Sequence, residues 1–438
     1  MKRSLAMTAT LAAAALALTA CGGGGGASSG GDNASSGEGG ALTLTMWHGF
    51  TGSDGPALQK VIDDFNASQD EVTINAEVFP WDSLYQKFLT SVTSGSSPDI
   101  VAMSTSNLAQ YAAKGVLTPT TDFYADSTYM DTAPLASGAI SASEYDGVNY
   151  GVPLDIGPIM LYWNKDLFTA AGLDPEKPPT TWDEFAEDAQ KLTIDENSDG
   201  KPEQYAISIG ETNTVPIYPA LFAENGGGVV SADGKTSLLD SQETLEAADF
   251  WIPKVVNDHI TPIGMTGEDA DQLFSSGKAA MEMNGPWLTT GLTDAGLNFG
   301  VTVPFKASAD ADLSVMTDAV SWTVPKTTSD EKRVAAYKFF AYWNSVEGQT
   351  TWANGSGFPP VRSDVPEGDL TNEYTKIFGS SEVLDAVSMF MTGVADNKEI
   401  NEQIFIPALQ KATSGSGEVD ELFTEASAQI QSTLDESK

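Results

Sequence analysis

The stretch LTLTMWHGF, residues 42–50, carries the pattern that decides the fold. Its apolar residues alternate with threonine as far as the tryptophan, which is typical of a β-strand. Pro56 suits the first turn of a helix, and the apolar residues from there to Phe65 have helical spacing. Residues 72–78 predict a second strand, and a helix and a short buried strand follow up to Met103. Alternating strands and helices indicate α/β layers with a largely parallel sheet.

Further helices are predicted later in the chain. Thr181 and Glu184 match a capping box, which begins a helix. Residues 334–343 predict another helix, and residues 409–437 contain two helical patterns separated by residues 414–417. Four tryptophans lie on helical patterns where we expect core packing: Trp182, Trp251, Trp343 and Trp352. The chain shows no repeat at a solenoid period, so a repeat architecture is excluded.

The N-terminus predicts export. A basic start, an apolar run over residues 5–17 and small residues before Cys21 are typical of a secretory signal peptide, and the run is too short to span a bilayer. Residues 18–21, LTAC, resemble the lipobox of bacterial lipoproteins, in which the cysteine is lipidated. We therefore expect a signal peptide over 1–20 and a protein anchored through Cys21 to the outer face of the bacterial cell membrane. An ordinary signal peptide with a chance cysteine is the alternative.

Residues 22–40 predict a flexible linker. Ten of these 19 residues are glycine and four are serine, a composition that cannot bury enough apolar surface to fold. The remaining residues, 41–438, are enough for two domains with separate cores. No other break of this kind follows, so we expect the two lobes to be interleaved in sequence.

Charge and composition narrow the ligand class. The formal net charge is -39, which repels nucleic acid and anionic lipid, so no nucleic-acid partner is expected. Beyond the signal peptide the chain has two arginines, Arg333 and Arg362. Clamps for phosphate or carboxylate usually use arginine, so a neutral ligand is favoured. Lysine can still bind phosphate as a point charge.

Five segments carry a family resemblance. In order they are Leu44–Gly49, Ser97–Val101, Tyr150–Pro153 with its continuation Leu161–Trp182, Phe274–Trp287 and Gly357–Arg362. Together they resemble the family 1 extracellular solute-binding proteins, the capture components of bacterial ABC sugar importers, which include maltose- and glycerol-3-phosphate-binding proteins. One departure is Trp163, where the family usually has tyrosine. It keeps an aromatic ring, so little is put in doubt.

The resemblance implies a periplasmic-binding-protein-like fold of type II. Two α/β lobes would be joined by hinge strands with the ligand in the cleft between them. We expect one lobe at residues 41–153 plus 306–355 and the other at 154–305 plus 356–438. A neutral sugar or oligosaccharide would be captured by hinge closure and delivered to the transmembrane subunits of an ABC permease. We expect a monomer with no cofactor and no catalytic activity.

Sugar sites combine aromatic platforms with hydroxyl, amide and carboxylate groups in a cleft. In open parallel α/β sheets ligands lie beyond the carboxyl ends of strands. That rule selects Trp47, His48, Trp81, Ser104, Ser106, Asn107 and Trp287. The resemblance adds weight to Trp287, because the matching tryptophan of maltose-binding proteins stacks on sugar. The alternatives are that Trp47 caps a core and that Trp81 packs at a helix start.

Further candidates are less specific. Asp155 and Asp318 could accept hydrogen bonds from ligand hydroxyls. The resemblance places Glu211, Asn213 and Tyr218 in a loop that contributes ligand contacts in the maltose-binding branch. Asn397 and Glu402 are the least specific candidates.

One motif resembles the start of a calcium loop, with oxygens at every second position. Its members are Asp195, Asn197, Asp199 and Glu203. The twelfth position is Ala206, where an EF-hand has a bidentate glutamate, so a polar hairpin turn is favoured and no metal site is expected.

Three other functions stay open at this point. A glycerol-phosphate ligand fits the same family. An exported glycoside hydrolase would need two carboxylates at a fixed separation, and 61 acidic residues make any pair unremarkable. A surface adhesin or cell-wall lectin would bind polymers without hinge closure.

Overall fold

The computed structural model describes residues 41–212 and 217–436. The predicted signal peptide, Cys21, the predicted linker and Asn213 lie outside the described residues. In the described part of the chain, no helix is long and apolar enough to cross a membrane.

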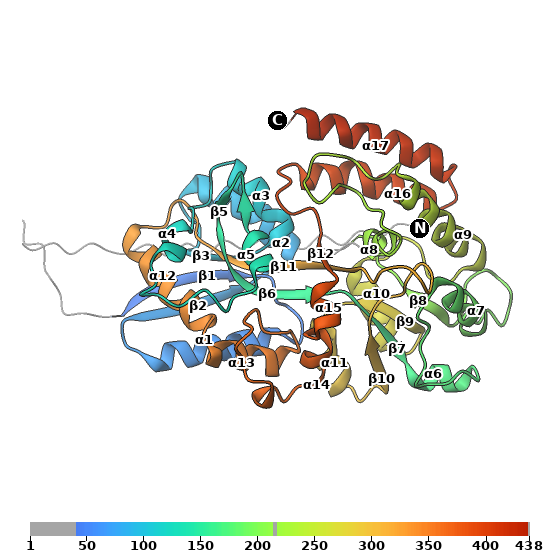
Figure 1. The fold of residues 1–438 in the computed structure, drawn as a ribbon, viewed down its shortest axis with the longest axis horizontal. Helices are drawn as coiled ribbons and strands as arrows, with labels where there is room; N and C mark the ends of the chain where they lie inside the picture. The colour runs from blue at the N-terminus through green and yellow to red at the C-terminus, as the bar shows by residue number, and fades with distance from the viewer. Residues whose placement is uncertain (1–40, 213–216, 437–438) are drawn as a thin grey trace, which may run out of the picture. The chain divides into compact units, whose positions relative to one another are not determined.

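Two main sheets organise the described chain (Figure 1). The first has the order β12-β11-β3-β1-β2, with β6 paired to β11, and the second has the order β10-β7-β9-β8. The strands of the first sheet are β1 (Leu42–His48), β2 (Val72–Val78), β3 (Ile100–Ser104), β6 (Gly151–Pro158), β11 (Val315–Thr323) and β12 (Val387–Met389). Those of the second are β7 (Met160–Asn164), β8 (Tyr205–Ser208), β9 (Ala279–Asn284) and β10 (Phe299–Thr302). A hairpin of β4 (Glu144–Tyr145) and β5 (Val148–Asn149) stands apart.

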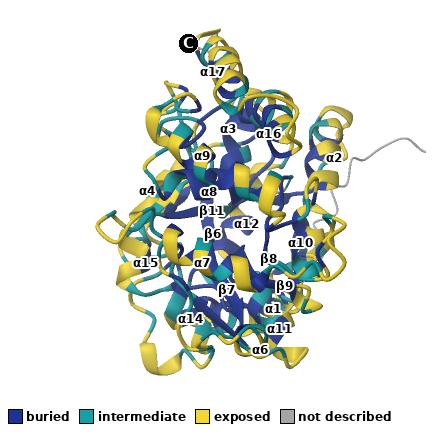
Figure 2. Cartoon of the chain, turned by 90° about the vertical axis from the view of Figure 1, so that its right-hand side faces the viewer, coloured by how far each residue is buried: buried dark blue, intermediate teal, exposed yellow. Residues whose placement is uncertain are grey.

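Helices follow most of the strands. Those before β6 are α1 (Gly55–Ser68), α2 (Trp81–Ser94), α3 (Thr105–Ala113), α4 (Thr121–Ala125) and α5 (Ser137–Ser141). Those between β7 and β11 are α6 (Lys165–Ala170), α7 (Trp182–Leu192), α8 (Ile217–Ala223), α9 (Gln242–Asp258), α10 (Gly267–Ser275) and α11 (Trp287–Asp294). Those after β11 are α12 (Asp330–Trp343), α13 (Val346–Ser356), α14 (Glu373–Phe378), α15 (Ser381–Asp385), the π-helix η2 (Glu399–Phe405), α16 (Ile406–Thr413) and α17 (Val419–Glu436), with a 3₁₀ turn η1 (Glu367–Asp369). Figure 2 shows the strands buried and the outer helix faces exposed.

The α/β layering is confirmed, but the expectation of a largely parallel sheet is correct only in part. β1 pairs in parallel with both β2 and β3, as the first stretch of sequence predicts. β11 then runs antiparallel to β3 and β6, and β7 runs antiparallel to β9 and β10. The physical reason is the chain path: β6 leads directly into β7 with one residue between them, and β11 returns in the opposite direction.

The predicted capping box forms with one change. The Thr181 hydroxyl oxygen accepts a hydrogen bond from the Glu184 backbone N–H at 3.3 Å. The Glu184 carboxylate accepts from the backbone N–H and hydroxyl of Thr180, at 2.8 and 2.7 Å, and these bonds lower its pKa. The box therefore closes one residue earlier than the sequence motif suggests.

Two large apolar clusters form the core. One contains residues of β1, α1, α12 and α13, including Trp343 and Trp352. The other contains residues of α7, α9, β9 and the C-terminal helices, including Trp182 and Trp251. The predicted core positions of these four tryptophans are confirmed by their burial. The residues from Ala41 onward belong to one compact unit, so the two-lobe boundaries stay a prediction.

The second sheet holds a buried carboxyl pair. Glu282 on β9 and Asp271 on α10 share a hydrogen bond, and the Asn284 side-chain amide donates to both, at 3.0 and 2.7 Å. Burial, followed by the neighbouring Asp271, raises the pKa of Glu282 well above its ordinary value. Glu282 therefore binds its proton more tightly in the folded chain than in the unfolded chain.

We expect this pair to contribute more to the stability of the fold in acid than in base. A raised carboxyl pKa stabilises the fold below the ordinary glutamate value of 4.5, and this contribution is lost as the pH rises through the higher folded value. Glu282→Gln should make the free energy of unfolding fall less steeply above pH 5, with a gain on the order of 1 kcal/mol at pH 8. Urea unfolding at several pH values measures this, with the exposed Glu382→Gln as control. Equal slopes in the wild type and Glu282→Gln would contradict it.

Candidate functional site

A cavity of about 440 Å³ lies between elements of the two sheets. Residues that precede β6 line one side, and residues that follow β7 line the other. The first group includes Thr51, Trp81, Asp82, Tyr85, Ser106 and Asn107, and the second includes Thr212, Thr266, Glu268, Phe390, Asn397, Lys398, Asn401 and Glu402. Parts of the chain far apart in sequence therefore meet around one space.

Five residues that the sequence singled out line this cavity: Trp81, Ser106, Asn107, Asn397 and Glu402. Ser104 lies directly behind them, because its hydroxyl accepts from the Asn107 side-chain amide at 3.0 Å and bonds the Ser106 hydroxyl at 3.0 Å. The strand-end rule thus places Ser106 and Asn107 correctly at the end of β3, where α3 begins.

Trp81 supplies the aromatic platform. It begins α2, and its ring lies so close over Gly49 that a Cβ there would come within 2.0 Å of it. The Trp81 ring also stacks on the Tyr85 ring, with the ring centroids 5.9 Å apart and an interplanar angle of 23°. Only glycine at position 49 allows this packing, so the residue after the first strand fixes the position of the ring.

Hydrogen bonds join the two sides of the cavity. The Asn397 side-chain amide donates to the Ser106 carbonyl oxygen at 2.5 Å. At another point the Ser53 hydroxyl donates to the Trp287 carbonyl oxygen at 2.9 Å and accepts from the Gly291 N–H at 3.2 Å. The described structure is therefore one in which the two sides are in contact.

Other predicted residues lie deeper. Trp47, His48, Asp155, Tyr218, Glu211 and Asp318 are all buried. Trp47 packs against Phe79 and under the Lys87 ammonium, 4.3 Å from its ring centroid. That position matches the alternative of a core cap, so its role as a ligand residue stays a prediction.

Several of these buried groups have polar atoms without a partner. Among the described residues, His48 Nδ1, Asp155 Oδ2, Glu211 Oε1 and the Tyr218 hydroxyl are buried and make no hydrogen bond. Buried polar atoms are nearly always hydrogen-bonded, so each of these needs an explanation. A ligand rich in hydroxyl groups is one kind of molecule that would satisfy such atoms.

Asp54, which is not among the residues selected from the sequence, belongs with this set. Its Oδ1 is buried and has no partner among the described residues, and burial raises its pKa to about 6. Burial also raises the pKa of Asp155, and the carboxylates of Asp54 and Asp318 raise it further. Burial lowers the pKa of His48 to about 4, so its imidazole is neutral at physiological pH. The signal that could have found Asp54 is its place in the loop after the first strand.

Trp287 packs where the two apolar clusters meet. Its ring is half-buried, packs against both apolar clusters and lies 6.1 Å from the Phe358 ring. A Cβ on Gly157 of β6 would come within 3.1 Å of it. Among the described residues it lines neither this cavity nor the one below. Its role in sugar stacking stays a prediction.

Sequence reasoning missed several lining residues. Thr266 caps α10 in a full capping box with Asp269, a signal that was available in the sequence. Asn401 lies in the π-helix η2, which leads into α16 and has no sequence signature. π-helical segments are frequent at functional sites.

The calcium-like motif forms a polar turn. Asp195 and Asn197 accept hydrogen bonds from the backbone N–H groups of Asp199 and Gly200, and Asn197 donates to Glu203 at 3.0 Å. These oxygens are therefore occupied by the turn itself. In residues 41–212 and 217–436 no group of three or more His, Cys, Asp or Glu is placed to hold a metal ion.

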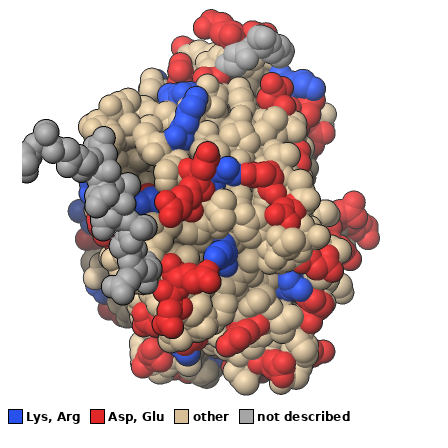
Figure 3. Space-filling model, turned by 90° about the vertical axis from the view of Figure 1, so that its left-hand side faces the viewer, with Lys and Arg blue, Asp and Glu red and all other residues tan. Residues whose placement is uncertain are grey.

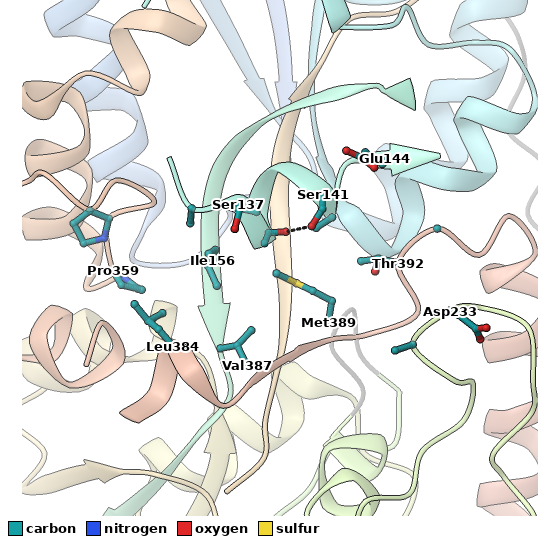
Figure 4. A pocket seen from close by; sticks show the side chains of 17 residues that line it. Ser137, Ser141, Glu144, Ile156, Asp233, Pro359, Leu384, Val387, Met389 and Thr392 are labelled. Atoms are coloured by element: carbon teal, nitrogen blue, oxygen red, sulfur yellow. Dashed lines mark hydrogen bonds between the residues drawn. The ribbon is translucent and has the colours of Figure 1, made fainter. Parts of the chain in front are cut away.

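A second cavity, of about 660 Å³, is lined by Ile156, Val387, Met389, Leu384 and other residues shown in Figure 4. Successive side chains of a strand point to opposite faces, so Ile156 points away from the face that carries Asp155. The second cavity is therefore on the other face of β6 from the Asp155 carboxyl group.

Comparisons with known proteins agree with this geometry. Residues 60–379 match the model of the family described as bacterial extracellular solute-binding protein. A putative binding protein of Brucella abortus is 26% identical over 410 residues, covering 92% of this chain and 95% of that protein. The sn-glycerol-3-phosphate-binding periplasmic protein UgpB of the same species is 26% identical over 326 residues, covering 73% of this chain and 74% of that one.

A solved structure shares the fold. The ABC transporter solute-binding protein of Thermotoga lettingae, bound with α-D-tagatose, has a TM-score of 0.78 at 23% identity and covers 90% of this chain and 100% of that one. The expected type II periplasmic-binding-protein architecture is confirmed by this likeness. The chain belongs to the bacterial extracellular solute-binding protein family.

Proposed function

We propose that this protein captures a neutral sugar or oligosaccharide outside the cytoplasmic membrane and delivers it to the permease of an ABC importer. The observation that carries the proposal is the cavity between the two sheets, which combines the Trp81 ring with hydroxyl and amide groups. Of the described residues that line it, only Lys398 is cationic, and its ammonium is paired with the Glu402 carboxylate at 3.8 Å. Such a lining suits hydroxyl groups better than a phosphate.

Capture would occur by closure of two lobes, residues 41–153 plus 306–355 and residues 154–305 plus 356–438. The division of the strands between two sheets and of the apolar side chains between two large clusters supports a division into two lobes. The sheets differ from these boundaries at β12 and most of β6, which belong to the first sheet although they lie in the second range. A ligand that contacts both lobes stabilises the closed form by the contacts that exist only there.

The binding residues fall into two groups. Trp81, Ser106, Asn107, Asn397 and Glu402 would contact ligand in the cavity, supported from behind by Ser104. The deeper atoms without partners, on His48, Asp54, Asp155, Glu211 and Tyr218, would bind ligand groups that reach further in. Asn213 lies outside the described residues. We assign it to the second group because it lies between Glu211 and Tyr218 in the sequence.

The proposed setting of the protein rests on its N-terminal sequence and on its family. Cleavage before Cys21 and lipidation of that residue would hold the protein at the outer face of the membrane through the linker at 22–40. The protein would act as a monomer without catalytic activity. The acidic surface in Figure 3, where red side chains outnumber blue ones on the face shown, is consistent with a protein that avoids polyanions.

A polyol phosphate is the second candidate ligand. The observation that favours it is the similarity to UgpB of Brucella abortus, which its name describes as binding sn-glycerol 3-phosphate. The ion-paired state of Lys398 argues against it, because phosphate would have to compete with Glu402 for that ammonium.

A thermal-shift screen of the mature protein separates these ligands. The four probes are tagatose, maltotriose, mannobiose and glycerol 3-phosphate. A ligand present at 100 times its dissociation constant should stabilise the fold by about 2.7 kcal/mol, and we expect this from at least one neutral probe. If glycerol 3-phosphate is the only probe that stabilises the protein, the proposed ligand is a polyol phosphate and not a neutral sugar. New reducing ends from maltotriose or mannobiose would contradict a binding protein without catalysis.

Trp81→Ala should lower the affinity for the bound sugar by about 10- to 100-fold, because the platform that covers its apolar face is lost. Trp81→Phe keeps a ring in the same place and serves as the matched control. Isothermal titration calorimetry measures both. Unchanged affinity in Trp81→Ala would show that the sugar does not stack there.

Trp287→Ala should lower the free energy of unfolding of the ligand-free protein by about 2 kcal/mol or more, because the ring packs between the two clusters. Urea unfolding measures the change, and calorimetry on the same variant measures any loss of affinity. A variant as stable as the wild type with much weaker binding would instead show that the ring serves mainly as a platform for sugar.

A further inference from the structure

A chain of hydrogen bonds runs behind the cavity wall at the end of β3. The Gln110 side-chain amide donates to Asn107 Oδ1 at 3.0 Å, and the Asn107 amide donates to Ser104 Oγ at 3.0 Å. Ser104 Oγ lies 3.0 Å from Ser106 Oγ, and the Ser106 hydroxyl donates to Asp318 Oδ2 at 2.8 Å. The chain therefore ends on a carboxylate of β11.

The number of protons on each group fixes which partner donates in every hydrogen bond of this network. An ionised carboxylate only accepts hydrogen bonds, and a hydroxyl has one proton to donate and two lone pairs. Ser106 gives its one proton to Asp318, so in the bond between the two serines Ser104 must be the donor. One lone pair on Ser106 Oγ then accepts from Ser104, and the other is left to accept a further hydrogen bond.

Asp318 itself is unsuited to contact ligand. It is buried, and its carboxylate accepts four hydrogen bonds, from the Thr105 hydroxyl at 3.0 Å, the Ser106 N–H at 3.3 Å, the Ser106 hydroxyl and the Ala319 N–H at 2.9 Å. Burial raises the pKa of Asp318 to about 6 while these donors oppose the rise, so the group is ionised at neutral pH. Ser106 and Asn107, by contrast, line the cavity.

We propose that Asp318 is a positioning residue that fixes the polarity of the cavity wall, so that the Ser106 hydroxyl accepts hydrogen bonds from ligand and does not donate them. This inference rests on the proposed function of the cavity and refines it. The ligand group at this wall is a hydrogen-bond donor, a sugar hydroxyl or an amine. A group that only accepts, such as a fully ionised phosphate oxygen or a fluorine in place of a hydroxyl, finds no donor at the Ser106 hydroxyl itself.

The wall also takes part in contact between the two sides of the cavity. The Ser106 carbonyl oxygen accepts from Asn397, which belongs to the segment before the π-helix η2. Ser106 therefore has two roles: Asp318 orients its hydroxyl, and its carbonyl oxygen accepts a hydrogen bond from the other side of the cavity.

Neutron diffraction from crystals of the deuterated, ligand-free mature protein at pD above 7 tests the polarity without any ligand. We expect deuterium between Ser106 Oγ and Asp318 Oδ2, and the deuterium of Ser104 pointing to Ser106. Deuterium of Ser106 that points to Ser104 or into the cavity overturns the proposal.

Substitutions test the consequence for binding. In Asp318→Asn the amide donates to Ser106 Oγ while Ser104 still donates to it, so both lone pairs are occupied and the serine proton turns into the cavity. We expect about tenfold weaker binding of whichever of the four probes binds the wild type. Ser106→Ala should cause a similar loss, and Asp318→Asn should add no further loss in the Ser106→Ala background.

Thr105→Val is the matched control, because it removes one donor to Asp318 and leaves the serine chain intact. Equal losses in Thr105→Val and Asp318→Asn, or additive losses in the double variant, contradict the proposal and indicate a general structural role. If no probe binds, the proposed function fails, and the neutron map alone decides the polarity. The map also decides it if Asp318→Asn does not fold.

Discussion

The pairing of β6 with β11 is the constraint on which the rest of the structure depends. The two strands run antiparallel from Thr317 opposite Pro158 to Thr323 opposite Gly151, and β11 also pairs with β3. β6 leads straight into the second sheet at Met160. This β6–β11 ladder therefore ties the two sheets together and places Asp155 beside the strand of Asp318. It also separates the Asp155 carboxyl group from the second cavity, which lies on the other face of β6. Any movement of one sheet against the other must bend this ladder.

Burial of acids is the second theme of the molecule. Asp54, Asp155, Asp318, Glu224 and Glu282 are all buried, and burial raises the pKa of each. They differ in their partners: Asp318 accepts four hydrogen bonds, whereas Asp54 and Asp155 each keep an oxygen without a partner among the described residues. A carboxylate whose oxygens all accept hydrogen bonds orients the groups that donate to it, whereas a carboxylate with a free oxygen can accept a further hydrogen bond. This difference assigns Asp318 to positioning and makes Asp54 and Asp155 candidates for contact.

Local patterns predicted the elements well and the site in part. The second strand and the helix after Pro56 follow from periodicity, and Ser106 and Asn107 follow from the rule that sites lie beyond strand ends. The environment of Trp287 could not be predicted, because Phe358 and Gly157 reach its ring only after distant parts of the chain pack together. The π-helix with Asn401 has no sequence signal, and the direction of the Ser106 hydroxyl depends on a strand 212 residues away.

The central claim is that two lobes close on a ligand in the cavity between the sheets. Small-angle X-ray scattering of the mature protein, with and without a saturating sugar identified by calorimetry, tests it most directly. The account predicts a smaller radius of gyration with the sugar bound and a scattering curve that matches the described structure. Saturation without any change in the radius of gyration, together with a ligand-free curve that already matches that structure, would contradict it.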